Sequence, residues 1–367
     1  MGRPIKVIIS GGGTGGHIFP AVAIANALKR MEPDTEILFV GATGRMEMEK
    51  VPAAGYKIIG LDIQGFQRSS VMKNILLPYK MLKSVLKARS IIKDFRPDVA
   101  VGVGGYASGP LLYAASQMGI PYLIQEQNSF AGITNKWLGK KARKICVAFE
   151  GMDKFFPADR IMLTGNPIRK EVVNIENKRF AAAEMLSLSP HKHTILVTGG
   201  SLGAGTLNKS FLAGVDKLIE ADVQLIWQTG KFYYQQIKEA LAGREHGNIK
   251  VMEFLHKMEL GYAAADVIVS RAGAGTIAEL CVIGKPVILV PSPNVAEDHQ
   301  TQNALALVKK GAAMMVADSL AERDLVDAAL NLVGNPGKSR LLGDNIRQMA
   351  LPDADEIIAK EVIKMAR

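Results

Sequence analysis

The sequences KVIISGGGTGGH (residues 6–17) and TILVTGGSLGA (residues 194–204) share one design. Each begins with a short apolar run rich in β-branched residues and continues into a glycine-rich loop that precedes a helical pattern. Glycines in such a loop permit positive φ and let backbone N–H groups approach a phosphate at a helix N-terminus. The two stretches therefore predict two strand–loop–helix units suited to binding phosphate groups.

Further short apolar runs surround both stretches and predict a parallel sheet in each half of the chain, because buried strands alternate with helical patterns. A helix is expected at residues 18–30. In the first half the expected strands are residues 6–10, 36–40, 99–103, 122–125, 145–148 and 160–163. In the second half they are residues 194–198, 225–228, 250–254, 267–270, 287–290 and 313–316.

Turn-rich residues 164–167 separate the two series. We therefore predict an α/β protein with two Rossmann-like, doubly wound domains, residues 1–165 and 166–349, which face each other across a cleft at the carboxyl ends of both sheets. Residues 353–367 have a helical pattern. Asp353 and Asp355 form the sole D-x-D sequence, and we expect a solvated helix start there.

The composition limits the kinds of site. Cys146 and Cys281 lie in apolar runs and are predicted to be buried free thiols. No residues have metal-ligand spacing, so we expect no metal. We also expect no cofactor. We find no signal peptide and no apolar stretch of about 20 residues, which predicts a soluble or peripheral protein.

The net positive charge of the chain comes entirely from the first half. Residues 1–165 hold 22 Lys and Arg against 12 Asp and Glu, whereas residues 166–367 hold 23 of each. This asymmetry predicts an anionic partner for the first half. Two clusters carry much of it: Arg68, Lys73, Lys80, Lys83, Lys87, Arg89, Lys93 and Arg96, and then Lys136, Lys140, Lys141, Arg143 and Lys144 beside Trp137.

The first cluster lies on an expected helix that starts near Pro78 and has two apolar stripes. One stripe holds Tyr79, Leu82 and Leu86, and the other holds Met81, Val85, Ala88 and Ile92. Both stripes could face the domain core, but the basic residues beside them favour an anionic membrane surface. Nucleic acid is disfavoured because the clusters lack interleaved stacking aromatics.

Gly11, Gly13 and Gly16 fit the G-x-G-x-x-G pattern of dinucleotide-binding domains. The acid expected after the second strand is missing, since Val40 is followed by Gly41-Ala42-Thr43, and this argues against NAD. A third loop, Gly102 to Tyr106, includes Gly104 and Gly105. One such loop could be a simple tight connection, but three favour phosphate binding.

Eight segments resemble, in order, the motifs of the MurG family of peptidoglycan N-acetylglucosaminyltransferases, which have the GT-B fold. They are residues 11–17, 102–110, 126–128, 134–136, 164–169, 199–204, 271–279 and 298–304. The resemblance implies an inverting enzyme that transfers GlcNAc from UDP-GlcNAc to the 4-hydroxyl of MurNAc in undecaprenyl-pyrophosphoryl-MurNAc-pentapeptide (lipid I). It also implies a peripheral position at the cytoplasmic face of the bacterial plasma membrane, and a C-terminal helix, about residues 350–367, that packs back on the first domain.

The second half is expected to hold the donor. Gly200, Gly203 and Ala204 can offer amides to the departing UDP without a metal. Ser201 could add a hydroxyl or merely cap the next helix. Arg169 could reach the pyrophosphate or be a solvated arginine. Thr276 lies in a glycine-rich segment, expected to precede the helix that carries Glu279.

The resemblance assigns further donor contacts. It gives Glu279 the ribose hydroxyls, although a surface glutamate is the alternative, and it places uracil near the backbone of Leu255. His299 and Gln300 match positions that contact the GlcNAc hydroxyls, or they simply start a helix. Donor contacts from the first half are expected at Thr14, Gly15, Gly16 and Asn128. Asn208 and Arg271 also match family motifs, and their roles stay open.

The first half is expected to hold the acceptor, whose hydroxyl loses a proton as it attacks. His17, with an ordinary pKa near 6.5, follows the first glycine loop and is the expected general base. Glu126, just beyond a strand, is the alternative base, or else an ion-pair partner of a lysine. Tyr106, Asn128 and Asn135 are further candidates on the cleft side.

Two other function classes stay open: a UDP-GlcNAc 2-epimerase, which needs neither lipid nor a basic surface, and a nucleotide-binding regulatory protein without turnover.

Overall fold

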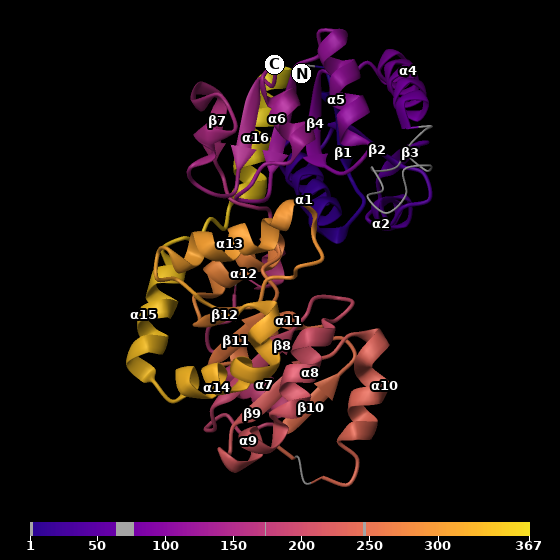
Figure 1. The fold of residues 1–367 in the computed structure, drawn as a ribbon. Helices are drawn as coiled ribbons and strands as arrows, with labels where there is room; N and C mark the ends of the chain where they lie inside the picture. The colour runs from indigo at the N-terminus through magenta and orange to yellow at the C-terminus, as the bar shows by residue number, and fades with distance from the viewer. Residues whose placement is uncertain (1–2, 64–76, 173, 245–246) are drawn as a thin grey trace. The chain divides into compact units, whose positions relative to one another are not determined.

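The computed structural model describes residues 3–63, 77–172, 174–244 and 247–367. The chain divides into two compact units, Met1–Ile168 with Pro352–Arg367, and Arg169–Leu351. Each unit contains a single sheet in which neighbouring strands run parallel, with helices around it (Figure 1). The predicted fold class is therefore confirmed for each unit.

The first unit has a seven-stranded sheet of order β3-β2-β1-β4-β5-β6-β7. Its strands are β1 (Lys6–Gly11), β2 (Glu36–Ala42), β3 (Lys57–Leu61), β4 (Val99–Gly104), β5 (Tyr122–Glu126), β6 (Lys144–Val147) and β7 (Ile161–Leu163). Its helices are α1 (Gly15–Met31), α2 (Glu47–Ala53), α4 (Leu77–Phe95), α5 (Ser108–Gln117), α6 (Ile133–Gly139) and α16 (Ala354–Ala366).

The second unit has a six-stranded sheet of order β10-β9-β8-β11-β12-β13. Its strands are β8 (Thr194–Thr198), β9 (Gln224–Gln228), β10 (Ile249–Met252), β11 (Val267–Ser270), β12 (Val287–Leu289) and β13 (Met314–Met315). Its helices are α7 (Arg179–Met185), α8 (Gly205–Ala213), α9 (Val215–Glu220), α10 (Lys231–Ala240), α11 (Met258–Ala264), α12 (Ala274–Ile283), α13 (His299–Val308), α14 (Ala321–Val333) and α15 (Pro336–Arg347).

Both strand orders reverse beside the first strand of the unit. β1 pairs with β2 on one side and β4 on the other, and β8 pairs with β9 and β11. Loops at the carboxyl ends of the strands diverge at such a switch point, where ligands of open parallel sheets bind. The three glycine-rich loops predicted from the sequence all follow strands at these two switch points.

Alternating residues of β1 pack on opposite faces of the first sheet. Ile8 belongs to a core that includes residues of α4 and α5, and Val7 and Ile9 belong to a core that includes residues of α1 and α16. Cys146 and Cys281 are buried free thiols, as predicted. The sequence patterns missed β3, whose KIIGL run is short and contains a glycine.

Helix α16 packs on α1 within the first unit. Its Ile358, Ala359 and Val362 are fully buried in the same core as Ile24. The expectation of a solvated helix start at residues 353–355 is wrong for Asp355, which is buried and accepts a 2.7 Å hydrogen bond from Nη2 of Arg30.

Helix α4 presents the predicted stripe of Tyr79, Leu82 and Leu86 on its surface, where the three side chains are 56–65% exposed. Ala88 and Ile92 of the other stripe lie in the core, whereas Met81 is exposed. Arg68 and Lys73 of the first basic cluster lie outside the described residues. In the described ranges, no helix is long and apolar enough to cross a membrane.

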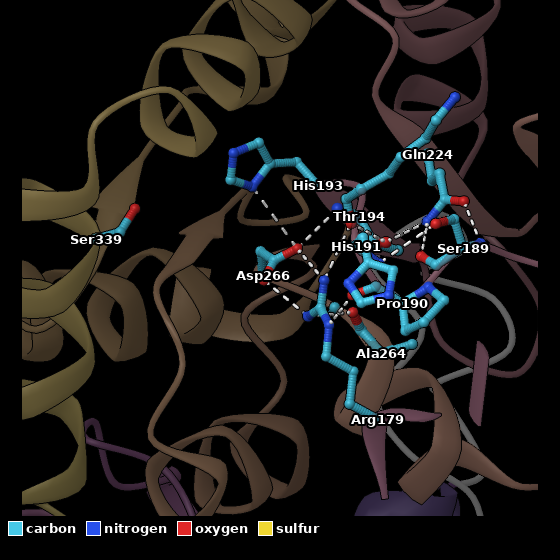
Figure 2. Close-up of polar contacts among 12 residues, drawn as sticks. Arg179, Ser189, Pro190, His191, His193, Thr194, Gln224, Ala264, Asp266 and Ser339 are labelled. Atoms are coloured by element: carbon cyan, nitrogen blue, oxygen red, sulfur yellow. Dashed lines mark hydrogen bonds and ion pairs between the residues drawn. The ribbon is translucent and has the colours of Figure 1, made fainter. Parts of the chain in front are cut away.

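At the amino ends of β8 and β11, Arg179 joins three segments of the second unit (Figure 2). Its guanidinium donates to both carboxylate oxygens of Asp266 at 2.8 and 3.0 Å and to three backbone carbonyls. A cavity of about 370 Å³ adjoins Asp266, His193 and Lys285. Nζ of Lys285 donates to the carbonyls of Ala263 and Ala265 at the end of α11. The charged groups of Arg179, Asp266 and Lys285 therefore have hydrogen-bond partners within the second unit.

Candidate active site

The first glycine loop connects β1 to α1 and packs against the loop after β4. Gly12 N–H donates to the Gly104 carbonyl at 3.3 Å. Gly105 has φ of +89°, and a Cβ there would overlap the backbone of Gly12. Backbone therefore lies on backbone, which requires glycine at this position. The helix begins at Gly15, three residues earlier than predicted, so Gly16 and His17 lie in its first turn.

His17 is partly buried beside these loops. Its Nδ1 lies 3.0 Å from the Gly12 carbonyl oxygen and 3.4 Å from Oγ1 of Thr14. Because a carbonyl can only accept, the neutral ring carries its proton on Nδ1 and its lone pair on Nε2. The ring packs on Gly104, where a Cβ would come within 2.7 Å of it. The geometry thus fixes both the tautomer and the orientation of the ring.

Glu47 was not among the predicted site residues. Its fully buried carboxylate accepts from Gly13 N–H at 2.8 Å and from Ala42 N–H at 2.9 Å. An acidic side chain does lie at the end of the second strand, although the sequence has none directly after it. This carboxylate is directed at the loop itself and so uses an amide that a phosphate would otherwise bind.

Glu126, at the end of β5, is 2% exposed and accepts hydrogen bonds from amide groups. Asn135 Nδ2 donates at 2.8 Å, Asn128 N–H at 3.1 Å and Gly132 N–H at 3.4 Å. Burial raises the pKa of its carboxyl, and these hydrogen bonds oppose the shift. The alternative of an ion pair with lysine is wrong: amides surround the carboxylate and fix the loop that carries Asn128.

Tyr106 lies in the loop after β4 and is 45% exposed. A Cβ at Gly13 would lie 3.9 Å from its ring, and the Arg45 guanidinium lies 5.8 Å from the ring centroid. An exposed aromatic ring therefore borders the first glycine loop close to Thr14, which is also exposed.

The second glycine loop, residues 199–204, connects β8 to α8. Gly203 has φ of +79°, and a Cβ there would overlap the Thr229 carbonyl. Asn208 holds the same carbonyl in place. Its buried side-chain amide donates to the Thr229 carbonyl and accepts from the Trp227 indole, both at 2.9 Å. Ser201 is exposed. It does not cap α8, because Ala204 occupies the N-cap position.

Gln228, a second residue that sequence patterns missed, links this loop to Leu255. Its Nε2 donates to the Gly200 carbonyl at 3.0 Å, and its Oε1 accepts from Leu255 N–H at 3.0 Å. Gln228 is buried at the end of β9. One neutral side chain therefore fixes the distance between the glycine loop and the segment expected to lie near uracil.

Glu279 lies on α12, which begins at Ala274, so the glycine-rich segment with Thr276 forms the first turn instead of preceding the helix. Arg169 donates to both oxygens of Glu279 at 2.9 and 3.1 Å, and the Tyr262 hydroxyl donates at 3.1 Å. Burial raises the pKa of Tyr262 well above its usual value, and the neighbouring Glu279 carboxylate adds to the shift. The alternative of a surface glutamate is wrong, because Glu279 is buried; Arg169 is half exposed, as a solvated arginine would be, but its guanidinium is paired with Glu279.

Two more predicted residues hold the loops after β11 and β12 together. Arg271 donates to Asp318 at 2.5 Å and to the Val290 and Pro291 carbonyls at 3.0 and 3.2 Å. Oε1 of Gln300 accepts from the backbone N–H groups of Ala272 and Ser292.

His299 and Gln300 open α13. Asp318 also accepts from Thr206 in the first turn of α8, so the second glycine loop and the later loops form one connected network.

Each unit therefore places a glycine-rich strand–helix connection at its switch point, with polar side chains around it. Residues 7–147 match the N-terminal domain of glycosyltransferase family 28, and residues 194–356 match its C-terminal domain.

Two of the relatives that match essentially the whole chain are transferases of one name. A protein of Bacteroides thetaiotaomicron, named UDP-N-acetylglucosamine–N-acetylmuramyl-(pentapeptide) pyrophosphoryl-undecaprenol N-acetylglucosamine transferase, is 58% identical over 100% of this chain and 99% of its own. A transferase of the same name from Parabacteroides distasonis is 54% identical over 99% of each chain. The crystal structure of Acinetobacter baumannii MurG superposes with a TM-score of 0.83 at 30% identity, over 98% of this chain and 100% of that one. The chain therefore belongs to glycosyltransferase family 28 and, within it, to the MurG family.

Proposed function

We propose that the protein transfers GlcNAc from UDP-GlcNAc to the 4-hydroxyl of the MurNAc residue in lipid I, with inversion, to form lipid II for peptidoglycan synthesis. The observation that carries this proposal is the 58% identity, over the full length of both chains, to a transferase named for that donor and acceptor. The residues around the two switch points give the reaction a physical basis.

The second unit would bind the donor. Amides of residues 200–204 at the N-terminus of α8 would face the pyrophosphate and stabilise the charge of the departing UDP. Glu279 would accept from the ribose hydroxyls, and Arg169 beside it would reach the pyrophosphate. Leu255 would lie at the uracil, and His299 and Gln300 at the sugar.

The first unit would bind the acceptor. The fixed Nδ1–H tautomer of His17 leaves Nε2 to take the proton of the attacking hydroxyl, so His17 would be the general base. Glu126 is a poorer candidate because it is buried and its oxygens accept from amides. Its role would be to hold Asn128 and Asn135. Thr14 at the N-cap of α1, and Gly15 and Gly16 in its first turn, would face substrate phosphate or sugar.

We further propose that the first unit contacts anionic lipid. Lys83 and Lys87 are exposed beside the stripe of Tyr79, Leu82 and Leu86 on α4. On α6, Ile133 and Trp137 are 74% and 54% exposed, close to the basic residues 140–144. Exposed apolar side chains with basic side chains beside them are typical of interfacial membrane contacts. This would bring the enzyme to the cytoplasmic membrane face, where its acceptor is embedded.

The enzyme assay measures UDP release from UDP-GlcNAc with and without a short-chain lipid I analogue. Release that depends on the acceptor, together with a disaccharide product, is expected. Formation of UDP-ManNAc without acceptor would instead identify an epimerase, and binding of UDP-GlcNAc without any product would identify a regulatory protein.

The membrane assay is flotation with liposomes of neutral or anionic lipid. We expect recovery with anionic liposomes to exceed recovery with neutral ones, and Lys83→Glu to reduce the difference. Lys238→Glu, on exposed α10 of the second unit, is the matched control. Equal recovery with both liposomes would exclude the electrostatic part of the proposal.

A further inference from the structure

Two side chains use opposite ends of one peptide group in the first glycine loop. The N–H of the Gly12–Gly13 peptide donates to Oε2 of Glu47 at 2.8 Å. Its C=O accepts from Nδ1 of His17 at 3.0 Å. The N–H and C=O of a planar trans peptide point in opposite directions. A single peptide therefore lies between the buried carboxylate and the imidazole and is hydrogen-bonded to both.

The position of Glu47 is tightly determined. Its other oxygen, Oε1, accepts from Ala42 N–H at 2.9 Å at the end of β2. A Cβ on Gly12 or Gly41 would overlap the side chain of Glu47, so both glycines leave the space that it fills. The residue lies in the first turn of α2, where a helix favours negative charge.

The opposite side of the loop is equally constrained. Gly12 N–H donates to the Gly104 carbonyl, and the backbone of Gly105 lies against Gly12. The His17 ring itself rests on Gly104. The loop thus has little room to shift, and the hydrogen bonds of its central peptide determine which nitrogen of His17 carries the proton.

We propose that Glu47 is a positioning residue for the transfer reaction, which acts through the Gly12–Gly13 peptide to hold His17 in the tautomer that accepts a proton at Nε2. The proposal rests on the role of His17 as general base. A hydrogen bond to a carboxylate polarises the peptide, and its carbonyl becomes a stronger acceptor for Nδ1–H. As the hydroxyl proton moves to Nε2, the same peptide stabilises the resulting imidazolium.

Glu47→Gln tests the proposal with little change in shape. A glutamine has one acceptor oxygen, so its NH₂ group must face either Gly13 N–H or Ala42 N–H. We expect kcat to fall about 10- to 100-fold, because one buried N–H loses its acceptor and the Gly12 carbonyl, no longer polarised by a charged group, holds Nδ1–H less strongly. The KM for UDP-GlcNAc should change less than about 2-fold, which on the affinity scale is a small effect. Glu49→Gln, on the exposed side of α2, should leave both constants unchanged.

A double-mutant cycle separates positioning from general loss of structure. In a His17→Gln background, Glu47→Gln should lower the residual kcat less than about 3-fold, because the group through which it acts is gone. The same 10- to 100-fold loss in both backgrounds would overturn the proposal. Glu47→Asp keeps the charge and should recover part of the activity lost in Glu47→Gln.

Nitrogen-15 NMR of the histidine rings needs no substrate and so stays informative even if the proposed activity is absent. The His17 signals, assigned by their loss in His17→Gln, should show the Nδ1–H tautomer in the unaltered protein. In Glu47→Gln they should shift toward the Nε2–H tautomer. An unchanged tautomer in a folded Glu47→Gln protein would refute the inference, whereas a missing transfer activity would refute only the proposed function.

Discussion

The two glycine loops have the same design in sequence but bind different groups. The first loop holds a carboxylate of its own protein, since Gly13 N–H donates to Glu47. The second is held by neutral groups, with Gln228 on the Gly200 carbonyl and the Thr198 hydroxyl near Gly200 N–H. The carboxylate at the first loop is consistent with the positioning role that we propose for it, and the neutral contacts of the second loop are consistent with its proposed binding of a diphosphate.

The largest expected effect comes from the first loop. His17→Ala should lower turnover by about 10²-fold or more, the scale of general-base catalysis, and leave the Kd for UDP-GlcNAc unchanged. Steady-state kinetics with a lipid I analogue and calorimetric titration with UDP-GlcNAc measure the two quantities. Near-normal turnover in His17→Ala, with loss of turnover in Glu126→Ala, would exchange the roles of these two residues.

The next effect concerns the shape of the second loop. Gly203→Ala should raise the Kd for UDP-GlcNAc at least about 10-fold, because an alanine at positive φ is strained by roughly 1–3 kcal/mol and its Cβ overlaps the Thr229 carbonyl. Gly200→Ala is the matched control: φ is similarly positive, at +84°, but a Cβ there meets open space. Equal Kd values for the two variants would show that the close packing at Gly203 does not determine donor binding.

A smaller effect is expected at Glu279. Glu279→Gln should weaken UDP-GlcNAc binding about 5- to 10-fold, since a carboxylate accepts stronger hydrogen bonds from ribose hydroxyls than an amide does. Because UMP retains the ribose and UDP adds one phosphate, the loss should be similar for both ligands. A loss confined to UDP would instead show that the change acts through Arg169 on the pyrophosphate.

The last prediction concerns stability, at the amino ends of the second sheet, where the effect on activity is expected to be the smallest. Burial lowers the pKa of Lys285 to about 8, against about 10.4 in an unfolded chain. Between pH 8 and about 10.4, Lys285 is protonated in the unfolded chain but largely neutral in the folded protein, so raising the pH favours the folded state. The unfolding free energy, relative to Lys285→Met, should rise by up to about 3 kcal/mol from pH 8 to 10.5. Urea unfolding measures it, and a constant difference would contradict the shift.

Most strands and all three glycine loops could be predicted because their signals are local: a run of β-branched residues and a cluster of glycines each fall within a few positions. The missing acid after Val40 argued against a dinucleotide site of the usual kind, and that argument stays a prediction. It could not reveal that Glu47, five residues beyond Ala42, returns its carboxylate to the same place.

Side chains whose partners are distant in sequence escaped prediction. In the sequence, nothing distinguishes Gln228 from other strand residues. Its role depends on hydrogen bonds to Gly200 and Leu255, which are distant in the chain. Asp355 resembles a solvated helix start until α16 lies on α1 and Arg30 covers it. Such contacts depend on how elements pack, which a single sequence without observed covariation does not encode in any short pattern.

The packing of α16 also has a consequence for biosynthesis. The first unit cannot complete its core when the ribosome finishes residue 168, because Ile358, Ala359 and Val362 fill part of it. A nascent chain must therefore keep the apolar side of α1 uncovered while the entire second unit is made. Chaperones would meet that surface during the interval, and a stop codon ahead of α16 would leave it permanently open to aggregation.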